Sequence, residues 1–219
     1  MKKTLITATA MLLFASSYAQ TSFKGFDLGV QVALNNSFIR GLTFFETAET
    51  SSVLRPGIFL FGTKSIGQDF YIKPGIGLNF KGGEITEDDT YEDWDGNIQR
   101  DSYIDRYKIS FLELPVLVGY NASEKIMIEG GVSLGFILSA TDDFDYTSTE
   151  YVEDNESGSE DLSRYLKGQE LGFHIGAKYA LNSKFAGGLR YFSGSDLNKS
   201  QLFTKITLSG LALYVEMKI

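Results

Sequence analysis

The sequence predicts an all-β protein, a transmembrane antiparallel up-and-down β-barrel of eight strands. The connections between its candidate strands alternate between long and short, and the short ones cover residues 64–69, 121–124 and 181–184. Tight turns on one side and long loops on the other are typical of membrane barrels. With 17 Phe, 12 Tyr, 23 Gly and only 3 Pro, the composition suits interfacial aromatic rings and close strand packing. After the N-terminus no apolar run approaches the length of a transmembrane helix, so a closed barrel is the spanning structure that remains.

The first 20 residues predict a secretory signal peptide. A basic start at Lys2 and Lys3 precedes an apolar stretch over residues 4–14 and a small-residue site at Ser17-Tyr18-Ala19. The alternative, an N-terminal transmembrane helix, is disfavoured because the apolar core is too short to cross a bilayer. We therefore expect residues 1–20 to be removed and residues 21–219 to form one barrel domain.

Charge and cysteine content limit the partners. Without Lys2 and Lys3 the chain carries 18 basic and 28 acidic residues, a net charge of −10. This acidity argues against nucleic acid as a partner. The chain has no Cys, which leaves neither a disulfide framework nor a lipoprotein anchor.

The strands show alternating apolar and polar residues, most clearly at the C-terminus, where Leu211, Leu213 and Val215 alternate with Tyr214 and Glu216. The expected strands are 24–34, 54–63, 70–80, 107–120, 125–139, 169–179, 185–192 and 203–219. Most are long enough for a tilted strand to cross a bilayer, which takes about 9–11 residues.

The polar face carries charges in the middle of strands. A soluble barrel would place apolar residues inside and charges outside, whereas a membrane barrel does the reverse. The side chains predicted to face the lumen are Lys73, Glu113, Glu129, His174, Lys178, Arg190 and Glu216. Counting from the short turns places Lys73, Glu129, Arg190 and Glu216 in one layer and Glu113 and His174 slightly deeper. A barrel of eight strands is just filled by its side chains, so we expect these charges to pair across the lumen. A narrow gated pore and a catalytic pocket are the alternatives.

Aromatic residues gather near both ends of the strands, as in the interfacial girdles of membrane barrels. The girdle expected at the short turns is Phe70, Tyr71, Tyr120, Tyr179 and Phe185. The girdle expected at the long loops is Phe80, Tyr107, Phe136 and Phe203.

Several short motifs resemble the PorT-like outer-membrane β-barrel family of Gram-negative bacteria. They include Pro56-Gly57-Ile58-Phe59, Leu112-Glu113-Leu114-Pro115 and Leu189-Arg190-Tyr191, and the likeness extends over the whole mature chain. The family often has a carboxylate where this sequence has Gly75. The resemblance implies an eight-stranded barrel in the outer membrane with both termini in the periplasm. One family member is associated with protein secretion and gliding, but the resemblance implies no single function.

His174 is the single histidine of the chain, and it lies on the expected lumen face. A Ser–His–carboxylate arrangement would need a hydroxyl from Ser133 or Ser139, both expected in the lumen, and Glu113 or Glu170 to orient the ring. No motif places these groups together, so we assign no catalytic residue.

The long loops are rich in carboxylates, and three aromatic residues lie among them. Tyr91, Trp94 and Tyr103 are candidate anchors for a protein or glycan partner. Oxygen-rich loops can hold calcium, but the Asp93–Asn97 spacing does not fit an EF-hand, and we assign neither a metal nor a cofactor.

These observations favour a non-enzymatic outer-membrane protein that stabilises the envelope or takes part in a secretion or uptake assembly. Its expected partners are outer-membrane lipid and envelope proteins. A lipid-modifying enzyme and a small channel remain alternatives.

Overall fold

The computed structural model describes residues 25–41, 48–150, 155–199 and 205–219, and their regular structure is entirely β. The predicted signal peptide lies outside this part. The strands are β1 (Asp27–Arg40), β2 (Glu49–Ser51), β3 (Val53–Ser65), β4 (Phe70–Glu92), β5 (Ile98–Asn121), β6 (Ile126–Ser148), β7 (Glu156–Asp161), β8 (Gln169–Ala180), β9 (Phe185–Gly194) and β10 (Thr207–Lys218). No helix among the described residues has the length and apolar character to cross a membrane.

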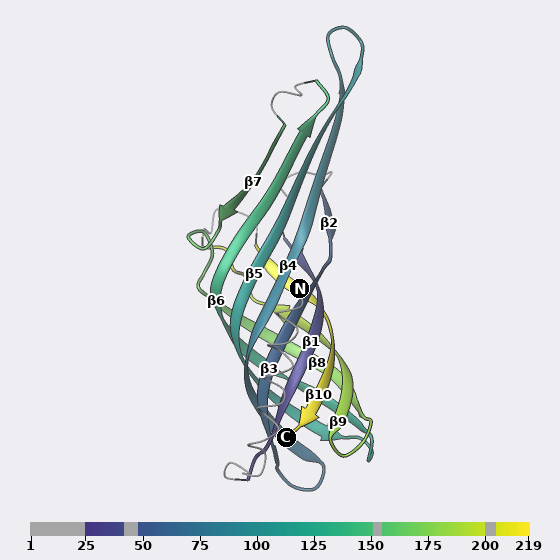
Figure 1. Ribbon diagram of the computed structural model, residues 1–219, viewed down its shortest axis with the longest axis vertical. Coiled ribbons are helices and arrows are strands. Elements are labelled where there is room, and N and C mark those ends of the chain that lie inside the picture. Colours follow the sequence, from purple (N-terminus) through teal and green to yellow (C-terminus); the bar gives the residue numbers. More distant parts are fainter. Residues whose placement is uncertain (1–24, 42–47, 151–154, 200–204) are drawn as a thin grey trace, which may run out of the picture.

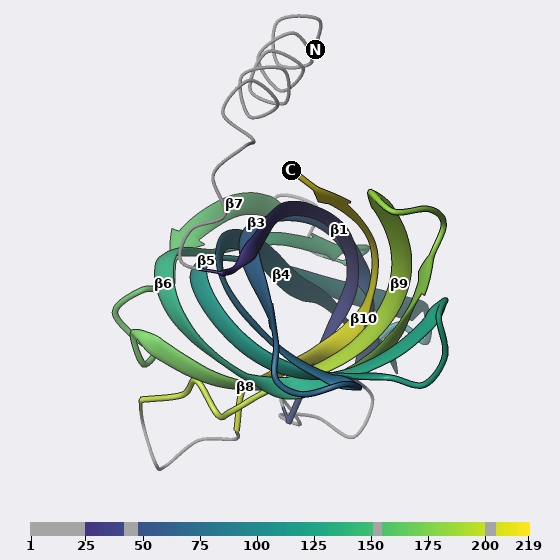
Figure 2. The ribbon, with the colours of Figure 1, turned by 90° about the horizontal axis from the view of Figure 1, so that it is seen from below.

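The strands close into a ring (Figure 2). Antiparallel pairing runs from β1 through β3, β4, β5, β6, β8 and β9 to β10, and β10 pairs back with β1. The short strands β2 and β7 pair only with β4 and β6, outside the ring. Of the ten strands in the described part of the chain, eight therefore form the wall, which confirms the predicted eight-stranded antiparallel barrel.

The alternation along the strands separates two surfaces. Apolar side chains project outward on every wall strand and stay exposed, as expected for a lipid-facing wall. They include Val32, Ile58, Ile76, Val118, Leu134, Ile175, Leu189 and Leu213. Their polar and charged neighbours point inward and are buried, among them all seven of the predicted lumen residues.

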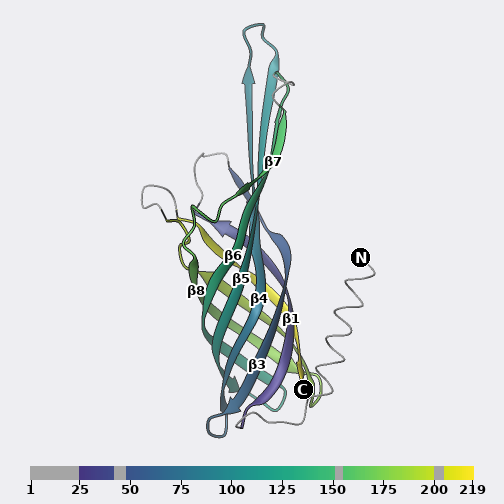
Figure 3. The same ribbon diagram turned by 60° about the vertical axis from the view of Figure 1, so that its left-hand side comes forward.

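Three strands continue far beyond the barrel, and here the expected boundaries were wrong. Residues 81–106 and much of 140–168 were expected to be loops, but the β4–β5 ladder runs unbroken to the Glu92↔Ile98 pair and β6 follows β5 to Ser148. Backbone hydrogen bonds continue the ladder although polar residues occur on both faces there, which hid it from an apolar–polar pattern. We call this extension of β4, β5 and β6 the projecting sheet (Figures 1 and 3).

Inside the wall, aromatic rings lie over glycines of the neighbouring strand. Tyr71 pairs across the sheet with Gly119, and Tyr214 pairs with Gly188. A Cβ atom at either glycine would overlap the tyrosine ring, so these glycines are required by close approach. The arrangement lets large rings lie flat against the wall and leaves the centre of the lumen to charged side chains.

An apolar cluster fills the end of the lumen beneath the projecting sheet. Leu166 and Leu197, from the segments between wall strands, are buried there beside the wall residues Ile109, Phe111 and Leu208. Because these connecting segments fold inward, they cap this end of the barrel.

The aromatic girdles are only partly as expected. Phe70, Tyr120, Tyr179 and Phe185 are exposed near the short turns, and the rings of Phe70 and Tyr120 lie 5.1 Å apart. Tyr71 was assigned wrongly, because it shares the inward parity of Lys73 and is buried.

At the other end, Tyr107 was also assigned wrongly, since it packs against the apolar cap. Phe80 and Phe136 are half-buried, and Phe203 lies outside the described residues.

Candidate functional site

The lower lumen layer, nearer the short turns, is organised around Glu129 of β6. Its carboxylate lies 2.8 Å from Lys178 Nζ, 3.0 Å from an Arg190 terminal nitrogen and 3.4 Å from Lys73 Nζ. The hydroxyl of Tyr71 donates to it at 2.8 Å. Because five strands contribute to this cluster when Tyr214 and Glu216 are included, the layer ties much of the wall together across the lumen.

The upper layer is organised around Lys81 of β4. Its ammonium lies 2.6 Å from Glu170 Oε2 and 3.3 Å from Glu113 Oε2. Asn79 donates to Glu113 at 2.6 Å, and Asn35 donates to Asn79 at 2.7 Å. The two layers together contain four cations and four carboxylates besides His174, so the buried charges balance.

The structure places Lys73, Glu129, Arg190 and Glu216 in the lower layer, together with Lys178, and Glu113 and His174 in the upper layer. Sequence reasoning missed Lys81, which was placed in a loop, and did not include Glu170 in the lumen set. Both follow the alternation, since Lys81 has the parity of Lys73 and Glu170 that of His174. Extending the period-2 pattern past residue 80 would have found Lys81, whereas Glu170 already lies on the His174 side of the expected strand 169–179.

His174 contacts both Ser133 and Glu113, but not in the geometry of a catalytic triad. Its Nε2 lies 2.7 Å from Ser133 Oγ and 3.3 Å from Glu113 Oε1, while Nδ1 has no hydrogen-bond partner among the described residues. A triad needs the hydroxyl and the carboxylate on opposite ring nitrogens. Here both groups contact one nitrogen and the other nitrogen has no partner in the described part of the chain, so the three residues are not arranged as a triad.

Ser139 was expected in the lumen and is exposed instead. The β5–β6 register shifts between Ser110 and Phe111, where the pairing passes from Ser139 to Ile137. The extra residue at Leu138 is a β-bulge, which reverses the parity of the side chains that follow.

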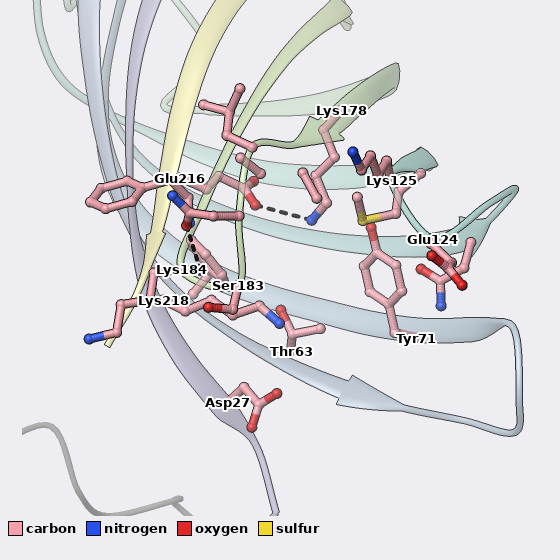
Figure 4. A pocket seen from close by; sticks show the side chains of 18 of the residues that line it. Asp27, Thr63, Tyr71, Glu124, Lys125, Lys178, Ser183, Lys184, Glu216 and Lys218 are labelled. Atoms are coloured by element: carbon pink, nitrogen blue, oxygen red, sulfur yellow. Dashed lines mark hydrogen bonds and ion pairs between the residues drawn. The ribbon is translucent and has the colours of Figure 1, made fainter.

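A cavity of about 450 Å³ opens at the short-turn end of the barrel (Figure 4). Tyr71, Lys178 and Glu216 line its inner part, so it ends at the lower layer. A void of about 20 Å³, bounded by His174 and Arg190, lies between the layers and has room for about one water molecule. Within the described residues the lumen is thus interrupted by two charged layers and an apolar cap.

The three aromatic residues predicted as loop anchors lie on the projecting sheet. Trp94, at the β4–β5 turn, is fully exposed, and Tyr103 stacks on Phe144 with ring centroids 6.5 Å apart. The hydroxyl of Tyr91 donates to Glu150 at 2.7 Å. The structure therefore places them on one continuous sheet, but at different points along it.

The carboxylate of Asp93 accepts hydrogen bonds from residues of its own turn. Asp93 Oδ1 accepts hydrogen bonds from the amides of Asp95 and Asn97, and Oδ2 accepts from the side chains of Asn97 and Gln99. These donors, that of Gln99 first, lower the pKa of Asp93 to about 2. No group of three potential metal ligands occurs among the described residues.

Comparison with known proteins identifies the family. A model described as "Outer membrane protein beta-barrel domain" matches residues 14–194, most of the chain. The chain belongs to this outer-membrane β-barrel family. Its exposed apolar wall therefore faces the lipid of the outer membrane. No curated protein matches the sequence.

Among solved structures, the chain is similar to Ail, the attachment invasion locus protein of Yersinia pestis, with 11% identity and a TM-score of 0.43 over 89% of this chain and 99% of that one. It is similar to Neisserial surface protein A, with 9% identity and a TM-score of 0.39 over 88% and 97%. It is also similar to the outer membrane protease OmpT of Escherichia coli, with 7% identity and a TM-score of 0.49 over 91% and 99%.

Proposed function

We propose that this outer-membrane barrel is a non-enzymatic interaction protein, with the barrel as a rigid anchor and the projecting sheet as the part that binds a partner. The observation that carries the proposal is the contrast between a lumen filled by ion pairs and a sheet that extends three wall strands away from the membrane. Binding sites commonly lie on the connections of a rigid scaffold. The short turns and both chain termini then face the periplasm, and the projecting sheet faces outward from the cell.

The two alternatives have less support. A channel would need a continuous water path, whereas the cavity at the short turns ends at the Lys178–Glu216 pair. An enzyme of the Ser–His–carboxylate type would need the two ring nitrogens of His174 to have different partners, and Ser133 and Glu113 share one.

Site-specific photo-cross-linking in cells would test the proposal. A photoreactive residue replaces Trp94 at the tip of the projecting sheet, and a matched control replaces Thr63 at the short-turn end. We expect a discrete cross-linked protein from position 94 that is absent from position 63. Equal products from both positions, or none from several positions along the projecting sheet, would contradict an interaction role for that sheet.

The same purified protein should be silent in planar lipid bilayers and should not react at Ser133 with a fluorophosphonate probe. Steady single-channel currents would instead favour the channel. Labelling of Ser133 that is lost in His174→Ala would favour the enzyme.

A further inference from the structure

The two faces of the projecting sheet differ in how their charges are balanced. The outer face continues the lipid-facing side of the wall, and its acids have basic neighbours: Arg106 lies 2.8 Å from Glu84 and also contacts Asp145, and Arg100 lies 3.0 Å from Asp88. Lys108 pairs with Asp143 on the same face. Three basic side chains thus form ion pairs with four of the acids on this face.

The inner face continues the lumen-facing side of the wall and lies above the capped mouth of the barrel. The pairing register places five carboxylates on it. They are Glu87, Asp89, Asp101, Asp105 and Asp142. None of them forms an ion pair with a described residue, and Asp89 lies directly opposite Asp101 across β4 and β5. Like charges that face one another across two strands are destabilising, so this face holds an uncompensated repulsion.

In three of these carboxylates, one of the two oxygens has no hydrogen-bond donor among the described residues. One oxygen each of Asp101, Asp105 and Asp142 is screened from solvent and has no donor within the described part of the chain. A screened acceptor without a donor costs about 1–3 kcal/mol. Burial and the neighbouring charge of Asp142 raise the pKa of Asp105 to about 7. The face is therefore short of both positive charge and N–H donors.

Aromatic rings lie among these carboxylates. Tyr103 stacks on Phe144 and lies 6.4 Å from the ring of Tyr146, and its own ring remains partly exposed. Such rings give a partner apolar contact area, and their faces attract ammonium and guanidinium groups.

We propose that the inner face of the projecting sheet is a docking surface for a basic polypeptide segment, whose Lys and Arg side chains would lie between the carboxylates and against the tyrosine rings. The inference rests on the proposed function and adds the chemistry of the partner. Charge complementarity supports this proposal. Four carboxylates of the outer face form ion pairs with cations of the same sheet, whereas the carboxylates of the inner face form none with described residues.

The test uses the full-length protein in zwitterionic lipid nanodiscs and two fluorescent nonapeptide probes, one of alternating Arg and Gly and one of alternating Glu and Gly. We expect saturable binding of the Arg peptide that weakens steeply with salt, and no binding of the Glu peptide. Neutralising the inner face with Asp89→Asn/Asp101→Asn should weaken binding about three- to tenfold.

The control neutralises two acids on the outer face, Asp88→Asn/Glu92→Gln, and changes the net charge by the same amount. It should leave the affinity within about twofold, because exposed charges on the far side are screened. Tyr103→Ala should also weaken binding of the Arg peptide. Tyr103→Phe should keep most of the wild-type affinity, because the aromatic ring remains.

Equal loss in both double variants would mean that net charge alone attracts the peptide, and this would overturn the docking surface. So would an Arg peptide that does not bind at all. If a partner still cross-links to position 94 in that case, the interaction role stands and only the basic nature of the partner is wrong.

Discussion

The ammonium group of Lys81 lies 2.6 Å from a carboxylate oxygen of Glu170, and it joins β4 to β8, two strands that are not hydrogen-bonded neighbours. Both side chains are about 1% exposed. Backbone ladders hold each strand to its neighbours only, so this pair adds a constraint across the barrel. Removing one partner of a buried ion pair strongly destabilises a protein, because the other charge is then left buried and unpaired.

Lys81→Met should therefore destabilise the protein by about 3–5 kcal/mol, because Glu113 and Glu170 would be left buried without their cation. The measurement is urea unfolding of the protein refolded in lipid vesicles. The folded fraction is read from the difference in gel mobility between the folded and the unfolded barrel. The double variant Lys81→Met/Glu170→Gln should recover part of the loss. A cost below about 1 kcal/mol for the single variant would contradict a tightly packed upper layer.

Gly119→Ala should be costly for a different reason. Its methyl group would overlap the Tyr71 ring, which lies over Gly119 and donates to Glu129 at 2.8 Å. We expect a loss of about 1–3 kcal/mol, as for overpacked cores, in the same unfolding experiment.

Gly130→Ala is the matched control for this change, because the nearest atom to its methyl group would be 3.7 Å away. Tyr71→Ala should make Gly119→Ala nearly neutral. If Gly119→Ala and Gly130→Ala cost the same, close packing of the ring over Gly119 is refuted.

The sequence predicted the wall well because lipid and lumen impose opposite requirements on alternate residues. Leu211, Leu213 and Val215 on one side and Glu216 on the other leave one arrangement for β10. Tyr71 shows what happens when residue type is weighed above parity: an aromatic residue near a turn was assigned to a girdle, although it lies two positions from Lys73 and so faces the lumen. The alternation already contained the correct answer.

The rest was harder to predict for physical reasons. Beyond the membrane both faces of a strand meet water, so the pattern that marks β4 and β5 fades although the ladder continues to Glu92 and Ile98. The bulge at Leu138 reverses the side-chain parity, and no residue type there signals it. The contact of both Ser133 and Glu113 with one nitrogen of His174 depends on barrel shear, which residue counting does not determine.

The lipid-facing side of β10 offers a direct test of the membrane wall. Leu213 is 62% exposed, and in a membrane this surface meets acyl chains. Leu213→Arg should cost about 2–4 kcal/mol in vesicles if it lies near the midplane. Thr147→Arg, at an exposed position on the projecting sheet, should stay within about 0.5 kcal/mol of the wild type. An equal cost of the two arginine substitutions would mean that Leu213 does not face lipid.

The inner face of the projecting sheet should respond to pH through Asp105. Burial, the charge of Asp142 and the charge of Glu87 raise the pKa of Asp105 from 3.8 to about 7 in the folded protein. A raised carboxyl pKa means that the folded state binds more protons than the unfolded state between about pH 4 and pH 7. Stability from this group is therefore fully present below pH 4 and is lost as the pH rises through 7.

Carbon-detected NMR of labelled aspartate should show one carboxyl that titrates near pH 7, and Asp142→Asn should move that midpoint downward because it removes the neighbouring charge. Asp105→Asn should raise the unfolding midpoint at pH 8 relative to the wild type, with the difference shrinking toward pH 4. Binding of the basic nonapeptide should weaken between pH 8 and pH 6 in the wild type and change less in Asp105→Asn. A carboxyl of Asp105 that titrates near pH 4 would mean that the inner face is open to water and its charges are already screened.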